Sequence, residues 1–417
     1  EVSDSPVDRM RDPEQVIYDE EVLARPLRNL ERKRIRLPEL IGLGKALADM
    51  LLPPTVREML LRSLEAVGPD QGLRLRLVLD EPQVADLPWE YVYLYLASGR
   101  GDPGRDGFLA LNPRISLVRH EAIPIAPGSV TATRPLKMMV GLSAPSDVTN
   151  LDLAAERGFI EEALNDVEGI EVDYVEHLTV EKLEAVGQGA HLFHFAGHGL
   201  FDWEDESAGV GSLALEDSEG YIHLFPAENL ARTLRGACVR LAVLGACESG
   251  RRDGVNVWGG VAPELMRHGI PGAVAMQYEI YDDSAIAFAR RFYQSLAVGL
   301  SLDEAVTAGR LGILNVGGPD DVDWGVPVLY MRSPDGVIFA EVAADPSLEK
   351  TREQLRVEIR QRVEEVRGRL LGAQVGEMTD GTVEVEQTIT TVGENGEVTG
   401  IKIGKLGSGT VKADDEA

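Results

Sequence analysis

Cysteine is nearly absent from this sequence: only Cys238 and Cys247 occur among its 417 residues. If both belong to one strand, nine residues separate them, which is about 30 Å of extended chain and too far for a disulfide. Free thiols fit a reducing compartment, so we predict a cytoplasmic protein. Cys238 has apolar neighbours and is expected to be a small buried residue.

Basic residues are also scarce. Lys and Arg number 41 against 69 Asp and Glu, which gives a net charge of −28. The only dense basic run is Arg32–Arg36, which is expected to be a solvated helix or strand face. Nucleic acids require clustered cations over a wider face, so we predict no nucleic-acid partner. An acidic surface also repels anionic membranes.

Long apolar runs and nucleotide-binding motifs are missing as well. No window of about 18 uninterrupted apolar residues occurs, so no membrane span is expected. The first residues are too charged for a signal peptide, and the start at Glu1 rather than Met suggests a trimmed chain. Gly42–Lys45 has the wrong spacing for a phosphate loop and is expected to be a helix turn. No cofactor is predicted.

The amino-terminal third divides into a polar leader at 1–24 and a folded part at 25–135. Helical spacing of apolar residues predicts helices over 38–66, interrupted by two prolines. Alternating leucines and arginines predict a strand at 73–79, and a second apolar run predicts a strand at 108–119.

From residue 136 to 340 the pattern alternates between strand and helix, which is typical of a parallel α/β sheet. Six strands are predicted, at 136–142, 170–176, 190–197, 239–247, 272–280 and 324–331. A covering hairpin is expected at 211–225. The predicted fold is an α/β, doubly wound, mostly parallel sheet of about six strands flanked by helices, with the amino-terminal half as a companion.

The carboxy-terminal part changes pattern twice. Residues 345–372 read as one charged helix, and residues 380–417 as a β-hairpin around Asn395-Gly396. Two strands are marginal alone in water, so the hairpin needs a partner sheet. That sheet is either this protein's own domain or another protein joined by strand addition.

Two reactive side chains follow two of the predicted strands. His198 ends the third strand and Cys247 ends the fourth, 49 positions later. In a sheet of order 2-1-3-4-5 these strands are neighbours, so both side chains reach the same ligand-binding edge. A thiol beside an imidazole predicts a cysteine nucleophile with a base, and the spacing is that of caspases.

Two further histidines precede His198. On a helix, His191, His194 and His198 would share a face and could bind zinc. The residues between them favour a strand, on which His191 points away from the other two. His194 is therefore expected to be a hydrogen-bonded core residue, and no metal site is predicted.

Several ordered motifs resemble those of CHAT-domain proteins, bacterial relatives of caspases and separases among the caspase-like cysteine peptidases. The motifs are L-P-W-E at 87–90, F-L-A-L at 108–111, H-F-A-G-H-G at 194–199, S-L-A-L at 212–215, L-G-A-C-E-S-G at 244–250, Asp282 with Phe292-Tyr293, and W-G-V-P at 324–327. The resemblance covers about residues 38–335. It implies that His198 activates the thiolate of Cys247, and that the N–H groups of Gly199 and Cys247 form the oxyanion hole.

The sequence departs from the family's pattern at one position. Some basic-specific relatives carry an acid two residues before the nucleophile, where this chain has Gly245. Asp282 could supply that acid as a substrate-binding residue, or it could be the N-cap of a helix at 284–298. No third member of a triad is evident.

Taken with the resemblance, these residues predict a cysteine endopeptidase that cleaves a protein substrate. The family implies a regulated effector protease in bacterial signalling or defence, with a sensor or effector partner recruited through residues 380–417. The alternative is a catalytically silent caspase-like binding or scaffold module. A nucleotide-binding α/β protein is a third reading, but the chain lacks G-x-G-x-x-G.

Overall fold

The computed structural model describes the chain with gaps. The described residues are 2, 4–10, 12, 14–16, 19–67, 71–79, 81–95, 107–120, 130–132, 134–148, 151–202, 210–246, 251–252, 255–317, 321–333, 335–341 and 350–356.

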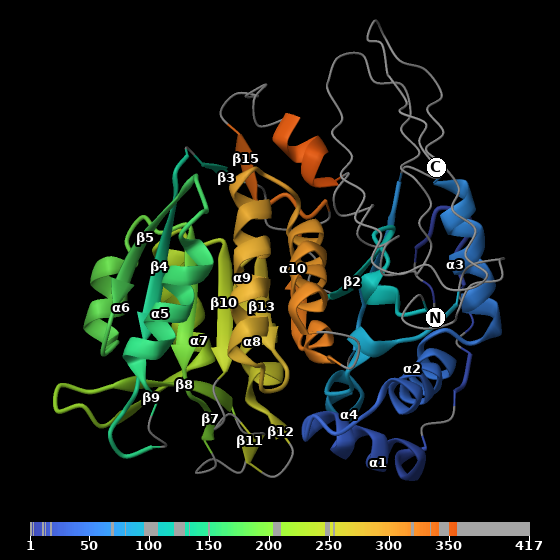
Figure 1. Cartoon of the computed structure of the whole chain (residues 1–417), viewed down its shortest axis with the longest axis horizontal. Coiled ribbons are helices and arrows are strands. Elements are labelled where there is room, and N and C mark those ends of the chain that lie inside the picture. Colours follow the sequence, from blue (N-terminus) through green and yellow to red (C-terminus); the bar gives the residue numbers. More distant parts are fainter. Residues whose placement is uncertain are drawn as a thin grey trace, which may run out of the picture.

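Helices and strands alternate through most of the described chain (Figure 1). The helices are α1 Glu20–Glu31, α2 Leu37–Leu51, α3 Pro54–Ala66, α4 Pro82–Ala85, α5 Leu153–Leu164, α6 Val180–Val186, α7 Ala227–Gly236, α8 Val257–Arg267, α9 Asp282–Ala297 and α10 Leu302–Gly317, with 3-10 turns η1 Trp89–Tyr91, η2 Leu109–Leu111 and η3 Asp323–Gly325. The strands are β1 Leu73–Leu77, β2 Ile115–Arg119, β3 Val130–Ala132, β4 Leu136–Leu142, β5 Ile170–Val175, β6 Leu192–Gly197, β7 Gly199–Asp202, β8 Val210–Glu216, β9 Ile222–Pro226, β10 Leu241–Ala246, β11 Arg251–Arg252, β12 Val255–Asn256, β13 Gly272–Met276, β14 Pro327–Met331 and β15 Phe339–Glu341.

One mixed sheet organises the fold, with strand order β1-β2-β14-β13-β10-β6-β4-β5. The strands β5, β4, β6, β10 and β13 run parallel in the predicted 2-1-3-4-5 order, and β14 is antiparallel to β13. The predicted α/β, doubly wound, mostly parallel class is confirmed. The sheet has eight strands rather than six because β1 and β2 extend it beyond β14.

The central strands are buried on both faces, which explains their nearly continuous apolar sequences. Side chains of α5, α9 and α10 share a core with Leu136, Val140 and Leu192 on one face. Side chains of α6, α7 and α8 share a second core with Phe193 and Phe195 on the other face. Consecutive residues of β6 therefore enter different cores, as strand alternation requires.

The amino-terminal residues form an integral part of the same core. Asp19 caps α1 by accepting hydrogen bonds from two backbone N–H groups, and Leu23 and Leu30 are buried. The helix therefore begins inside the stretch predicted as a loose leader at 1–24. Both strands of this half join the central sheet, and a single bridge links Arg119 to Tyr330 of β14.

Two predicted strands are shorter than their apolar runs. The run at 108–119 begins with η2, because Leu111 donates its N–H to the carbonyl of Phe108 and Asn112 donates to that of Leu109 before β2 starts. The run at 324–331 begins with η3, and Trp324 packs against the ring of Phe108 at 4.9 Å. At both places the apolar composition correctly indicated burial, but it did not indicate that the backbone forms a 3-10 turn rather than a strand.

The basic run at Arg32–Arg36 is not uniformly solvated. Lys33 lies on the turn after α1, where its Nζ pairs with the buried carboxylate of Asp323 at 3.1 Å. The same ammonium lies 3.5 Å from the centre of the Tyr281 ring. Gly42–Lys45 lies within α2 as expected, and Gly44 allows close packing because a Cβ there would lie 2.4 Å from the Tyr91 carbonyl oxygen.

The two ends of the parallel strands carry different structures (Figure 1). β7 follows β6 at the carboxyl end and forms a three-stranded sheet with β8 and β9, which includes the expected hairpin. β3 pairs with β15 at the opposite end, ahead of β4. In Figure 1 β7 lies at the bottom and β15 at the top of the molecule.

Only a part of the predicted helix at 345–372 is described, and it lies at this opposite end. Residues 350–356 are helical. Arg352 donates to the carbonyl of Val298, which caps the carboxyl end of α9, and Arg356 pairs with Glu304 at 2.9 Å. The rest of that helix and the predicted hairpin at 380–417 lie outside the described residues.

In the part of the chain that the structure describes, no helix is both long and apolar enough to cross a membrane.

Candidate functional site

His198 lies where the predicted edge requires it. It occupies the single residue between β6 and β7, and it is 2% exposed. Its carbonyl accepts a hydrogen bond from the N–H of Ala214 in β8 at 2.9 Å. Gly197 before it is sterically required, because a Cβ there would lie 2.6 Å from the Phe195 ring and 3.0 Å from the Ser143 carbonyl oxygen. The histidine backbone is therefore held by neighbours on both sides.

Cys247 lies outside the described residues, but the strand that leads to it is described. β10 ends at Ala246, which pairs with Gly197 of β6 in the parallel ladder. The next residues along the two chains are Cys247 and His198. The contact between these two side chains stays a prediction. The strand register that it requires is present as far as Gly197 and Ala246, the residues just before them.

The predicted oxyanion hole is described only in part. Gly199 is the first residue of β7 and lies opposite Leu213 of β8. Its role, and that of the Cys247 N–H, remain predictions.

Asp282 is the first residue of α9 and is exposed. The alternative that it caps the helix was wrong, because Tyr281 is the N-cap and makes no side-chain capping bond. An acid in the first turn still interacts favourably with the helix dipole. Its proposed role in substrate binding is open to a test.

The other two histidines have structural partners. The Nδ1 atom of His191 accepts a hydrogen bond from the N–H of Lys137 at 2.9 Å. His194 is 8% exposed, and its Nδ1 lies 2.7 Å from the hydroxyl oxygen of Tyr293. The prediction that His194 is a hydrogen-bonded core residue is confirmed. Among the described residues no cluster of His, Cys, Asp or Glu is suited to hold a metal ion.

A buried ion pair near this edge was not anticipated from the sequence. Glu90 of the L-P-W-E motif is fully buried, and its carboxylate pairs with Arg119 at 2.8 Å. Arg119 also donates to Gln277, which follows β13, and Gln277 donates to the carbonyl of Asp86. Burial alone would lower the pKa of Arg119, but attraction to Glu90 and Tyr330, together with the hydrogen bond to Glu90, raises that pKa. The signal for this pair in the sequence was an acidic residue, Glu90, inside the apolar L-P-W-E motif.

Cys238 corrects an expectation. It is exposed rather than buried, and its φ of 68° places it in a left-handed turn between α7 and β10. It is therefore not part of the strand that leads to Cys247, and the helix-to-strand turn rather than core packing determines its position.

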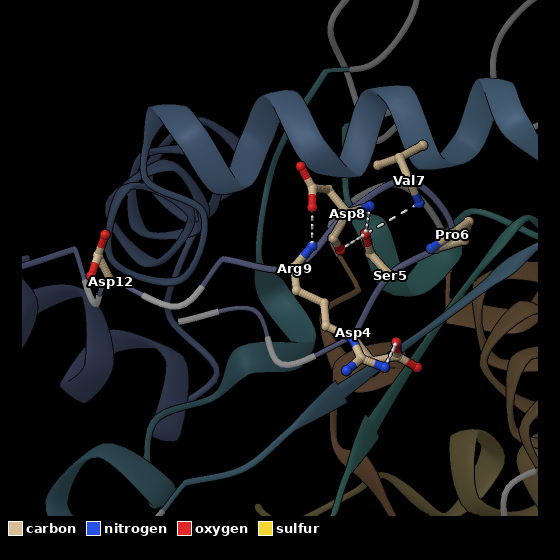
Figure 2. A pocket seen from close by; sticks show the side chains of 7 residues that line it. All are labelled: Asp4, Ser5, Pro6, Val7, Asp8, Arg9 and Asp12. Carbon is tan, nitrogen blue, oxygen red and sulfur yellow. Dashed lines mark hydrogen bonds and ion pairs between the residues drawn. The ribbon is translucent and has the colours of Figure 1, made fainter.

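A pocket of about 670 Å³ lies on the amino-terminal segment (Figure 2). Its lining residues are Asp4, Ser5, Pro6, Val7, Asp8, Arg9 and Asp12. They contact one another through local bonds, such as Ser5 Oγ to the Asp8 carbonyl and Arg9 to Asp4 at 3.4 Å. The pocket contains none of the predicted site residues.

Comparisons with known proteins point to one family. A family model described as the CHAT domain matches residues 42–346, which include every strand of the eight-stranded sheet. No curated protein matches the chain.

Two solved structures of the Saccharomyces cerevisiae separase–securin complex are similar to the chain at 14% identity. The match to the structure at 3.0 Å resolution covers 62% of this chain and 15% of the matched chain in the complex, with a TM-score of 0.34. The one at 2.6 Å covers 76% and 23%, with a TM-score of 0.36. This chain therefore spans less than a quarter of the length of either structure's chain.

Proposed function

The chain belongs to the CHAT-domain family, and from this membership we propose that it is a caspase-like cysteine endopeptidase with Cys247 as nucleophile and His198 as base. The observation that carries the proposal is the ladder between β6 and β10, which pairs Gly197 with Ala246. Adjacent strands lie about 4.8 Å apart. If the ladder continues by one residue, the thiol of Cys247 and the imidazole of His198 would be close enough for a hydrogen bond.

The proposed reaction is acyl transfer through the sulfur. His198 takes the thiol proton of Cys247, and the thiolate attacks the carbonyl carbon of the scissile bond. The C=O electron pair moves to the oxygen, which the N–H groups of Gly199 and Cys247 would stabilise. The C–N bond then breaks, and the imidazolium gives its proton to the leaving amine. Water then attacks the thioester carbon and gives a proton to His198, the C–S bond breaks, and His198 returns that proton to the sulfur as the carboxyl product leaves.

The burial of His198 supports a regulated enzyme. Little of the proposed base is accessible in this structure, since His198 is 2% exposed. We therefore propose that an activating event precedes cleavage, as expected of an effector protease in bacterial signalling or defence. Two cysteines without a predicted disulfide fit a reducing compartment, so we propose a cytoplasmic location. A sensor or effector partner would act through residues 380–417.

An electrophilic thiol probe tests the proposal, because the chain has only two thiols. Cys238 is exposed and would react without any catalytic role, so the assay uses Cys238→Ser protein. We expect fast labelling of Cys247 that His198→Ala slows by at least tenfold. Mapping of new protein N-termini in lysate, active enzyme against Cys247→Ala, then identifies substrates. Equal labelling with and without His198, and no new N-termini, would support the scaffold alternative.

A further inference from the structure

His194 is a buried histidine that the proposed reaction does not use. It lies in β6, four residues before His198. Its ring is 8% exposed and contacts the hydroxyl of Tyr293 from α9 through Nδ1. Burial lowers the pKa of His194 to about 4, so the ring is neutral at physiological pH.

The contact with Tyr293 determines which ring nitrogen carries the proton. Tyr293 is 1% exposed, and His194 is the only hydrogen-bond partner of its hydroxyl among the described residues. If Nδ1 carried the proton, the phenol proton would have no acceptor, and an unmade buried hydrogen bond costs about 1–3 kcal/mol. The phenol therefore donates to Nδ1, and the proton of the neutral ring resides on Nε2.

The Nε2 donor lacks a partner among the described residues. Across the ladder His194 pairs with Val243 of β10. Two residues further along that strand is Gly245, where a Cβ would lie 3.9 Å from Nε2 and 3.3 Å from the carbonyl oxygen of Phe195. Apart from the two residues adjacent to Gly245 in the chain, no other described residue has an atom within 4 Å of that position. The glycine thus leaves the donor uncovered, where any larger residue would lie against it.

This donor is close to the proposed nucleophile. Gly245 precedes Cys247 by two residues, and two Cα–Cα steps span at most about 7.6 Å. When the sulfur of Cys247 attacks the scissile carbonyl, the substrate side chain just before that bond would have to span a distance of this order to reach Nε2 of His194. An amide or carboxylate side chain is long enough to do so.

We infer that His194 is a specificity-determining residue: its Nε2–H, left uncovered by Gly245, donates a hydrogen bond to an oxygen of the substrate side chain that precedes the cleaved bond. The inference rests on the proposed peptidase function. Amide and carboxylate side chains carry such an acceptor oxygen. Lysine and arginine carry only donors, so they would leave two donors facing each other. Aliphatic side chains would leave the histidine donor unpaired.

Profiling with peptides that differ only at the residue before the scissile bond tests this inference on the full-length chain. The wild-type protein should favour Asn, Gln, Asp or Glu over Leu, Lys or Arg by at least tenfold in kcat/KM. A buried donor discriminates strongly against substrates that leave it unpaired. His194→Phe should remove that preference, and His194→Gln, which retains an N–H donor, should restore part of it.

Gly245→Ala gives a second, independent variant that keeps the histidine. Its methyl group would lie between the substrate and Nε2, so the same preference should fall although His194 is intact. His191→Gln is the matched control, because His191 lies at the amino end of β6 and contacts Lys137 instead. Melting temperatures verify that each variant is folded.

The possible outcomes separate this inference from the proposed function. If Cys247 labels and peptides are cleaved, but His194→Phe and Gly245→Ala keep the wild-type profile, only the role of His194 is overturned. A wild-type preference for Lys or Arg would overturn it as well. If Cys247 neither labels nor cleaves any peptide, the proposed function fails and the inference fails with it.

Discussion

Gly197 of β6 and Ala246 of β10 face each other as partners in a parallel ladder, one residue before His198 and Cys247. Parallel strands end at the same edge of a sheet, so this pairing connects two positions that are 49 residues apart in sequence. The first prediction follows from it. Cys247→Ala and His198→Ala should each reduce proteolysis by several orders of magnitude, because nucleophile and base act as a unit.

Rates of substrate cleavage measure that loss, and the melting temperature of each variant verifies that the fold survives. Cys238→Ser is the matched control, since it removes the exposed thiol and should retain activity. A folded Cys247→Ala protein that still cleaves its substrate would end the idea.

Asp282→Asn tests the other candidate for substrate binding. If the exposed carboxylate of Asp282 pairs with a basic substrate residue, removing its charge should weaken cleavage after Arg or Lys selectively, by up to about fivefold. Asp283 is the neighbouring exposed acid in the same turn, so Asp283→Asn is the control for a general loss of negative charge. Unchanged rates across a peptide library would exclude the binding role.

Deletion of residues 380–417 tests the proposed recruitment role. Arg352 attaches the described end of the chain to Val298 at the carboxyl end of α9, and the strands carry His198 at their other end (Figure 1). We therefore expect the deletion to leave peptide cleavage and melting temperature unchanged while binding of, or activation by, a partner is lost. A fall in basal activity and melting temperature would show instead that the tail belongs to the enzyme's own fold.

The neutral ring of His194 predicts a dependence of stability on pH. Its pKa is lowered from 6.5 to about 4 by burial. Between pH 4 and 6.5 His194 binds a proton in the unfolded chain but not in the folded one. Its contribution to the free energy of unfolding is therefore complete above pH 6.5 and is lost as the pH falls towards 4. The loss amounts to about 3 kcal/mol at most.

Urea unfolding at several pH values measures this contribution. In His194→Phe protein the decline of unfolding free energy between pH 6.5 and 4 should be shallower than in the wild type. Comparing how steeply the unfolding free energy changes with pH, rather than its absolute value, separates the protonation of His194 from the loss of its hydrogen bond to Tyr293. Parallel curves for the two proteins would contradict the assignment.

The buried pair of Glu90 and Arg119 predicts a large effect on stability. Glu90→Gln leaves the guanidinium buried without its counter-charge, which typically costs about 3–5 kcal/mol. Glu161→Gln is the matched control, because the Arg157–Glu161 pair is exposed on α5 and such pairs contribute about 0–1 kcal/mol. Unfolding free energies measure both, and similar small changes would mean that the first pair is not isolated from water.

Local patterns in the sequence determined the fold class and the identity of the candidate pair. The apolar runs of β4, β6 and β10 can be predicted because strands buried on both faces need apolar residues throughout. His198 and Cys247 were identifiable because each follows such a run beside glycine or alanine. The turn at Cys238 and the 3-10 turns η2 and η3 could not be predicted, because composition and burial do not determine the backbone conformation at the ends of helices and strands.

Only the tertiary structure decided which distant groups meet. Glu90 and Arg119 are 29 residues apart and His194 and Tyr293 are 99 apart, and neither separation leaves a periodic trace in the sequence. Strand order joined β1 and β2 to the central sheet, and packing of α9 on β6 brought a phenol to one nitrogen of His194. These contacts depend on how elements pack in three dimensions, whereas sequence periodicity reports only which side of each element is buried.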